Sequence, residues 1–208
     1  MSVGTRRHDP ELTFSRTELR DLVVAWIVLS IAFALLLAPI HRGADAGVFL
    51  LMIGLSLVTV GVAFLLHELA HKVVAIEYGQ LAEFRADYQW LFLAVMFALV
   101  GFLFAAPGAV YHRGRITVEE NGHIALAGPV TNLVLAVLFF PLMIFPGFLG
   151  LIGHMGVLIN LFLAAFNMIP FGPLDGKTVL EWSTPVFALA FGASVLSLVG
   201  FILVFGFW

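Results

Sequence analysis

The sequence contains no cysteine, few charged residues and no long cluster of basic side chains. Without cysteine the chain can form no disulfide and can offer no thiolate to a metal, so His, Asp and Glu would have to supply any ligands. The net charge of −3 is small, and with no basic cluster we expect no nucleic-acid partner. No internal repeat, low-complexity linker or separate soluble domain is apparent.

Apolar residues dominate the sequence instead. Hydrophobic residues make up 62% of the chain and charged residues 11%, and the mean hydropathy is +1.07. These values lie outside the range of soluble globular proteins and predict an all-α polytopic membrane protein. We expect residues 1–208 to form a single membrane-embedded domain in the lipid bilayer.

About five apolar segments are long enough to cross a bilayer. They cover residues 22–40, 48–66, 124–145, 149–169 and 186–208. The polar segment 1–21 precedes the first of them and is rich in arginine, so the positive-inside rule predicts a cytoplasmic N-terminus. The second apolar segment then runs inward, and its end lies near the cytoplasm.

Residues 90–106 are also apolar, but they close on Pro107-Gly108. We expect this segment to be re-entrant, entering the membrane without crossing it. That arrangement leaves nine lysines and arginines inside and only Arg42 outside, whereas a crossing gives six against four, which the positive-inside bias disfavours. The following residues 109–111 are β-prone, and 112–122 form a charged loop that could complete a small hairpin.

The most informative motif is His67-Glu68-Leu-Ala-His71, at the end of the second apolar segment. Histidines four residues apart lie one turn apart on the same helix face, so both imidazoles can reach one metal ion, with Glu68 beside them. This spacing is typical of zinc hydrolases, in which zinc acts as a Lewis acid and the carboxylate handles the proton. The alternative, ordinary polar residues at a helix end, is disfavoured because ionisable groups in lipid need a partner, a cavity or a metal.

A second polar group follows the fourth apolar segment, in the stretch Asn167-Met-Ile-Pro170-Phe-Gly-Pro173-Leu-Asp175-Gly176. Two prolines break the helix, and unwound backbone at membrane depth is tolerated only where it is buried in protein or lines a wet cavity. Asp175 lies just beyond this break and could supply the third ligand that a catalytic zinc needs. Two simpler roles for Asp175 stay open, a helix N-cap and an ion-pair partner of Lys177.

Three motifs together resemble the signatures of the site-2 protease family of intramembrane zinc metalloproteases. In order, they are His67-Glu-Leu-Ala-His71, Gly128-Pro129-Val-Thr-Asn132 and Asn167 through Leu174-Asp175-Gly176. The resemblance covers roughly residues 48–185. The chain departs from the family in having Lys177 where members often have a second glycine, and in having one clear span after the last motif where some relatives have two.

The resemblance implies a function and a set of roles. The chain would hydrolyse a peptide bond within or near the transmembrane segment of a single-span membrane protein. His67, His71 and Asp175 would ligate one zinc ion, and Glu68 would be the catalytic carboxylate. Asn167 would lie near the scissile carbonyl, where its amide could stabilise the oxyanion. An unwound substrate needs new backbone partners, and strand addition to residues 109–111 could supply them.

Other interpretations of these residues remain. A membrane metal-handling or transport protein could use the same His and Asp residues as a transit site, although a carboxylate beside the first histidine and the lack of inverted repeats disfavour it. A catalytically inactive relative is a third possibility, which the presence of all four central residues disfavours. For Asn132, His154 and Asn160 we expect interhelical hydrogen bonds at least as readily as chemistry. His112 and His123 flank the charged loop and are expected to be solvated.

Overall fold

The computed structural model describes residues 11–102 and 107–207. Within these ranges, five helices are long and apolar enough to cross a membrane, which confirms the predicted polytopic architecture. They are α1 (Arg16–Leu37), α2 (Ala46–Glu77), α4 (Val118–Phe139), α5 (Phe148–Asn167) and α7 (Thr184–Phe205). The shorter elements are η1 (Ile40–Arg42), β1 (Leu81–Ala86), α3 (Tyr88–Val100), β2 (Gly108–Arg113), η2 (Phe140–Ile144) and α6 (Asp175–Trp182).

Several long helices begin before their apolar runs, because polar caps hold the first turn. The Ser15 side chain accepts the Glu18 N–H at the start of α1, and Asp45 caps α2 in the same way. Thr117 and Glu120 form a reciprocal capping box at the start of α4. Part of the polar segment 1–21 therefore belongs to the first helix, while residues 1–10 lie outside the described part of the chain.

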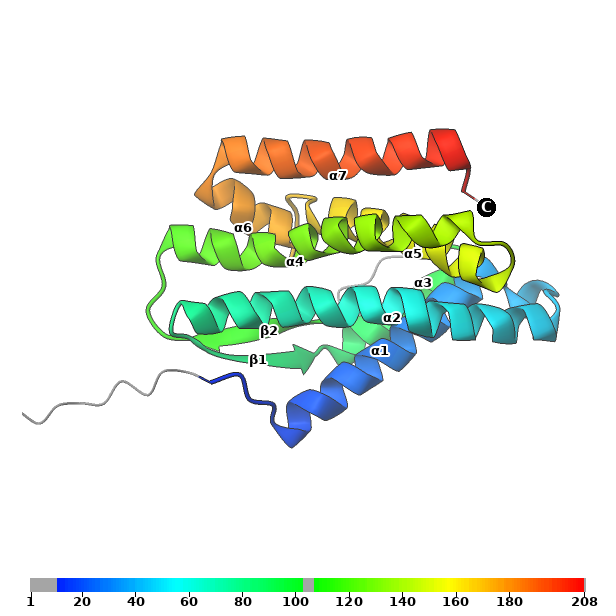
Figure 1. The fold of residues 1–208 in the computed structure, drawn as a ribbon. Coiled ribbons are helices and arrows are strands. Elements are labelled where there is room, and N and C mark those ends of the chain that lie inside the picture. The colour runs from blue at the N-terminus through cyan, green and yellow to red at the C-terminus, as the bar shows by residue number, and fades with distance from the viewer. Residues whose placement is uncertain (1–10, 103–106, 208) are drawn as a thin grey trace, which may run out of the picture.

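Helix α2 lies at the centre of the molecule and packs against α1, α4 and α5. In Figure 1, α7 lies on one side of the α4 and α5 pair, and α1 and the strands lie on the far side of α2. Helices α2 and α5 run in the same direction, and α4, which lies between them in the sequence, runs antiparallel to both. The C-terminal ends of α2 and α5, which carry the two polar groups predicted to meet, therefore lie at the same end of the bundle.

Strands β1 and β2 form a two-stranded antiparallel sheet, with Leu81 opposite Arg113 and Ala86 opposite Gly108. The predicted β structure at residues 109–111 is confirmed. Its partner, however, is not the charged loop 112–122, because that stretch contains the capping box that starts α4. The sheet instead joins segments on either side of α3, a long-range pairing that the polar sequence of 81–86 did not predict.

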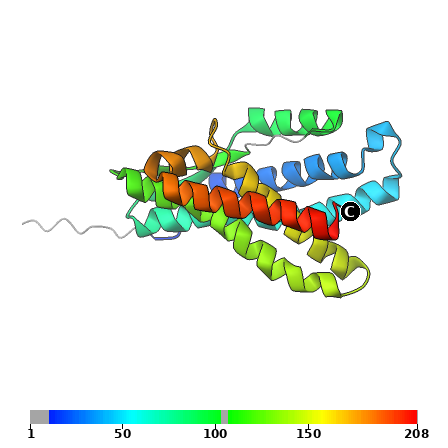
Figure 2. The same cartoon turned by 90° about the horizontal axis from the view of Figure 1, so that it is seen from above.

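Helix α3 covers most of the predicted re-entrant segment 90–106, of which residues 103–106 lie outside the described part of the chain. The helix packs along α1, and Figure 2 shows it at the edge of the molecule. At its far end the Leu99 carbonyl accepts hydrogen bonds from His41 (2.7 Å) and Arg42 (2.9 Å). Because Ala86 pairs with Gly108, the chain leaves and returns at one place, as expected of a segment that does not cross.

Candidate metal centre

Three side chains that are far apart in the sequence meet at one point beside α2. The Nε2 atoms of His67 and His71 are 3.0 Å apart. Asp175 Oδ2 lies 3.2 Å from Nε2 of His67 and 3.4 Å from Nε2 of His71. Among the described residues, this is the one group of three or more His, Asp or Glu side chains whose ligand atoms converge on a point that could hold a metal ion.

The two imidazoles are oriented by hydrogen bonds from their other ring nitrogens. Nδ1 of His67 donates to Oδ1 of Asn132 (2.6 Å), and Nδ1 of His71 donates to the Ile124 carbonyl (2.7 Å). Since neither acceptor carries a proton, each Nδ1 must be the protonated nitrogen, which leaves the Nε2 lone pair facing the shared point. Metal-ligating histidines are held in this way by an outer partner.

The spacing of the three atoms fits a zinc ion. Ligands about 2.0–2.1 Å from a tetrahedral zinc lie about 3.3 Å apart, close to the three separations found here. Space for the imidazoles depends on Gly128 of α4, because a Cβ at that position would lie 2.5 Å from ring atoms of both histidines. The glycine of the second motif is therefore explained by close contact with the ligands.

Asp175 reaches the histidines because the chain breaks between α5 and α6. Asp175 is the first residue of α6, its N-cap is Leu174, and its carboxylate contacts the imidazoles, so the N-cap alternative is wrong. Gly176 allows the close turn, since a Cβ there would lie 2.1 Å from the Met168 carbonyl oxygen.

Glu68 is buried beside the two histidines, and its Oε2 has no hydrogen-bond partner within residues 11–102 and 107–207. An unpaired buried carboxylate oxygen is costly unless a ligand or water completes its bonding. Both Glu68 and the three converging side chains line one cavity of about 210 Å³. The carboxylate is therefore available to a molecule that occupies this cavity.

Strand β2 forms one wall of the cavity. The Asp87 N–H donates to the Pro107 carbonyl (2.9 Å), and alternate residues of β1, here Arg85 and Glu83, therefore also direct their backbone N–H and C=O groups toward β2. In an antiparallel pair, the residues opposite these on β2 direct their backbone groups toward β1. The residues between them on β2 direct their backbone groups away from the sheet. The intervening residues of β2 all line the cavity: Gly108, Val110 and His112. The cavity thus faces a strand edge that carries no further strand among the described residues.

The remaining predicted residues have mixed outcomes. Asn132 and Asn160 are fully buried and joined by a 3.0 Å hydrogen bond, which confirms the expected interhelical role and adds the contact of Asn132 to His67. Asn167 lines the cavity, but its amide donates to the Leu163 carbonyl of its own helix (3.0 Å). Nε2 of His154 has no partner within the described residues, and its ring lies 5.1 Å from that of Phe201.

Two histidines that were expected to be solvated are partly buried. His112 lines the cavity from β2, and His123 is half-buried, with its ring against Trp182 and its Nδ1 2.6 Å from the Tyr78 hydroxyl. Neither contact could be predicted from the sequence, because both depend on segments that are distant in the chain. The polar residues 112–122 predicted a loop, but α4 begins within this stretch.

Comparison with known proteins identifies relatives over nearly the whole chain. The chain is 45% identical over 200 residues to "Putative zinc metalloprotease MJ0611" of Methanocaldococcus jannaschii, an alignment that covers 94% of this chain and 97% of the relative. The chain belongs to this zinc metalloprotease family. It is also 29% identical over 149 residues to "Putative zinc metalloprotease YwhC" of Bacillus subtilis, covering 62% of this chain and 68% of the relative.

A further relative of this metalloprotease is "Putative zinc metalloprotease Rip3" of Mycobacterium tuberculosis, with 31% identity over 166 residues. That alignment covers 77% of the present chain but 38% of Rip3. No family model matches the sequence, and no solved structure matches it. The relatives are named for zinc and for proteolysis, and His67, His71 and Asp175 form a group that fits a zinc ion.

Proposed function

We propose that this metalloprotease cuts within the membrane, as a member of the site-2 protease family that hydrolyses a peptide bond in or near the transmembrane segment of a membrane-anchored protein. The observation that carries the proposal is the position of the metal group. His67 and His71 project from α2, one of the five apolar helices, into a cavity walled by α4, α5 and the open edge of β2. A protease that acted on soluble substrates would have no need of such a site.

The open edge of β2 supports this kind of substrate. A transmembrane helix hides its peptide bonds in hydrogen bonds along its own axis, so it must unwind locally before it can be cut, and its freed backbone groups then need partners. The outward backbone groups of Gly108, Val110 and His112 lie along the cavity and can pair with an extended peptide. Most of the other side chains that line the cavity are apolar and suit the apolar residues of a membrane span.

Zinc, when bound by His67, His71 and Asp175, supplies a Lewis acid at the scissile carbonyl. Glu68 acts as the general base: its carboxylate takes the proton of a water molecule as the oxygen of that water bonds to the carbonyl carbon. It then delivers the proton to the amide nitrogen as the carbon–nitrogen bond breaks. Asn167 uses one hydrogen of its amide group on the Leu163 carbonyl, and the second hydrogen can donate to the developing oxyanion.

The orientation and the partners are part of the same proposal. The N-terminus and the metal site face the cytoplasm, the substrates are single-span membrane proteins, and the enzyme meets them in the lipid bilayer. A site near the cytoplasmic end of α2 keeps the path of water to the metal short. The arginines at the start of the chain favour this orientation through the positive-inside bias.

The test is cleavage of a panel of single-span membrane proteins by the purified, detergent-solubilised or reconstituted enzyme, with and without a chelator. We expect cleavage inside the span of at least one substrate, its loss with chelator and its return with added zinc. Product masses locate the cut bond. Cleavage confined to soluble loops or to soluble proteins would contradict the proposal while leaving the metalloprotease assignment intact.

A further inference from the structure

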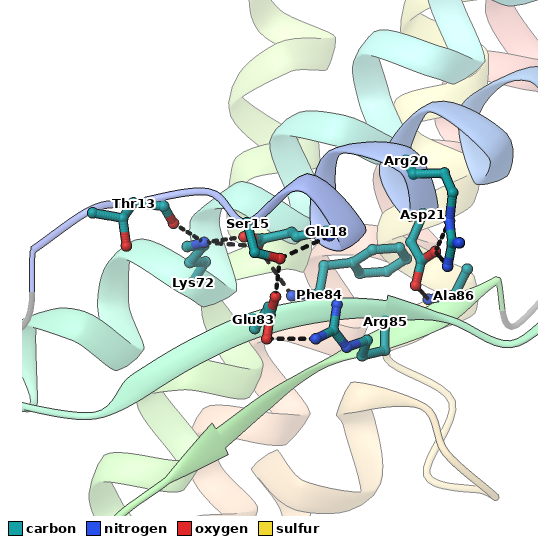
Figure 3. A network of polar contacts seen from close by, with 10 residues as sticks. All are labelled: Thr13, Ser15, Glu18, Arg20, Asp21, Lys72, Glu83, Phe84, Arg85 and Ala86. Carbon is teal, nitrogen blue, oxygen red and sulfur yellow. Dashed lines mark hydrogen bonds and ion pairs between the residues drawn. The ribbon is translucent and has the colours of Figure 1, made fainter.

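A buried ion pair joins α1 to α2 directly behind the metal centre. Lys72 follows the ligand His71, and its Nζ lies 2.7 Å and 2.6 Å from the two carboxylate oxygens of Glu18. The third donor of the ammonium group goes to the Thr13 carbonyl (2.5 Å). Both side chains are almost fully buried, at 3% and 1% exposure. Figure 3 shows the pair at the centre of a polar network between the helix and the strand.

Stability alone does not account for such a pair. Removing two charges from water is costly, and apolar side chains of similar volume often hold helices together equally well. The Glu18 carboxylate, however, makes a bond that an apolar side chain could not make. Its Oε1 also accepts the backbone N–H of Phe84 in β1 (3.0 Å). The ion pair therefore fixes a carboxylate against a strand.

Asp21 repeats this contact one turn further along α1. Its Oδ2 accepts the N–H of Ala86 (3.3 Å), and its Oδ1 accepts the hydroxyl of Tyr88 (2.8 Å). Phe84 and Ala86 are the β1 residues whose backbone groups point away from β2. Residues three apart on a helix are separated by about 4.5 Å along its axis and alternate residues of a strand by about 6.7 Å, so the two carboxylates reach successive outward N–H groups.

Strand β1 also packs against α2 through the side chain of Phe84. The Phe84 ring packs edge-to-face on Phe64, with ring centroids 5.7 Å apart, one turn before His67 and Glu68. Phe84 is thus held by its side chain to the helix that carries the metal ligands and by its backbone to the carboxylate that Lys72 orients. Any shift of β1 along α2 would have to break both contacts, and β2 would move with it.

We propose that Glu18 is a positioning residue for the substrate strand. Held by Lys72, it closes the outer edge of β1 and fixes the sheet on α2, so that an extended peptide adds only to β2, in the metal cavity and in one register. An unprotected strand edge is a general template for pairing, and a two-stranded sheet offers two such edges. The inference rests on the proposed cleavage of unwound membrane spans and extends it to the choice of strand edge.

The test compares two double variants that differ in one hydrogen bond. Glu18→Gln with Lys72→Met removes both charges but keeps a side-chain oxygen to accept the Phe84 N–H. Glu18→Ala with Lys72→Met removes the charges and the acceptor, and neither variant leaves a buried charge unpaired. Glu83→Ala is the control on the same strand, because its carboxylate accepts from the Arg85 side chain (2.7 Å) and from the Ser15 hydroxyl but from no backbone N–H of β1.

We expect both double variants to bind zinc as the unmodified enzyme does. The glutamine variant and the Glu83→Ala control should keep the KM and the cleavage position. The alanine variant should raise KM about tenfold and cut at additional positions, since the lost bond to a charged or amide oxygen is worth roughly one power of ten. Product masses report the position, which a purely stabilising contact would not change.

Backbone hydrogen exchange gives a readout that does not depend on catalysis. Exchange at the Phe84 amide should be slow in the glutamine variant and at least about tenfold faster in the alanine variant. Equal KM, cleavage position and exchange in the two double variants would overturn the proposal. Loss of zinc binding and of the fold in both double variants would mean that the Glu18–Lys72 ion pair only stabilises the protein, and this result would also overturn the proposal.

The outcome is separable from that of the proposed function. If the unmodified enzyme cuts no membrane span, the proposed function fails, and with it the role of Glu18 toward a substrate. The exchange experiment would still report whether Glu18 closes the edge of β1. If the unmodified enzyme cuts membrane spans and the two double variants behave alike, the positioning role alone is wrong.

Discussion

Asn132 holds His67 from the side opposite the metal. Its Oδ1 lies 2.6 Å from Nδ1 of the imidazole, while its Nδ2 donates to the Ala63 carbonyl (3.2 Å) and to Oδ1 of Asn160 (3.0 Å). Because both amide hydrogens are committed, the oxygen is fixed toward the histidine. A motif residue with an ordinary helix-packing position thus determines which nitrogen of His67 can bind zinc.

Replacing Asn132 by alanine should weaken zinc binding without removing a ligand. Loss of such an outer hydrogen bond lowers metal affinity by about 10- to 100-fold. Competition with a chromophoric chelator measures the change. Asn160→Ala is the matched control, since Asn160 contacts Asn132 and not the histidine, and it should have a smaller effect. Equal effects of the two variants would mean that the amides act through helix packing.

Glu68→Gln should separate chemistry from metal binding. The amide keeps the size of the side chain but cannot accept the proton, so we expect zinc content near that of the unmodified enzyme and cleavage slowed by about 100-fold or more. Metal analysis and single-turnover cleavage are measured on the same preparation. A variant that cuts at nearly the original rate would rule out Glu68 as the general base.

Asp175→Ala should lower zinc occupancy itself, as should His67→Ala and His71→Ala. Each removes an atom of the three-ligand group, and a catalytic zinc with two protein ligands is held weakly. Metal content after dialysis against a weak chelator gives the readout. Glu181→Ala is the control, because Glu181 is an exposed acidic residue on the same short helix. Full occupancy in Asp175→Ala would mean that the third ligand lies elsewhere.

Gly128→Ala tests the space around the ligands. A Cβ would lie 2.5 Å from ring atoms of both histidines, so the imidazoles must shift, and overpacking of this kind costs about 1–3 kcal/mol, or roughly 10- to 100-fold in zinc affinity. Gly192→Ala, in α7, is the control, since nothing lies within 4 Å of its added Cβ. Unchanged zinc affinity in Gly128→Ala would contradict the close fit.

The orientation of α3 and the sheet can be tested by labelling single cysteines in sealed cells, because the chain has no cysteine of its own. Arg115→Cys is exposed beyond β2 and should be protected from an impermeant external reagent. Ala46→Cys, exposed at the opposite end of α2, should react readily. Position 114 is avoided because the side chain of a cysteine introduced there would collide with Gln80. Ready labelling at 115 would mean that the segment 90–106 spans the membrane.

The sequence by itself determined the features that depend on local spacing. The apolar runs predicted five spanning helices, since a bilayer leaves a backbone few alternatives to a helix. The four-residue spacing of His67 and His71 placed both imidazoles and Glu68 on one helix, and two prolines marked the break before Asp175. These patterns need no knowledge of how the helices pack, because each is completed within one or two turns of chain.

Only the tertiary structure decided the contacts between distant segments. Asp175 had three open roles until the packing of α5 and α6 brought its carboxylate to the imidazoles. Apolar and polar residues alternate from Ala82 to Ala86, which is compatible with a strand, but the pairing of β1 with β2 across α3 arises from the docking of the sheet on α2. The polar segment 1–21 predicted only a cytoplasmic N-terminus, whereas Glu18 is buried because Lys72 and the Phe84 N–H together offset the cost of removing its carboxylate from water.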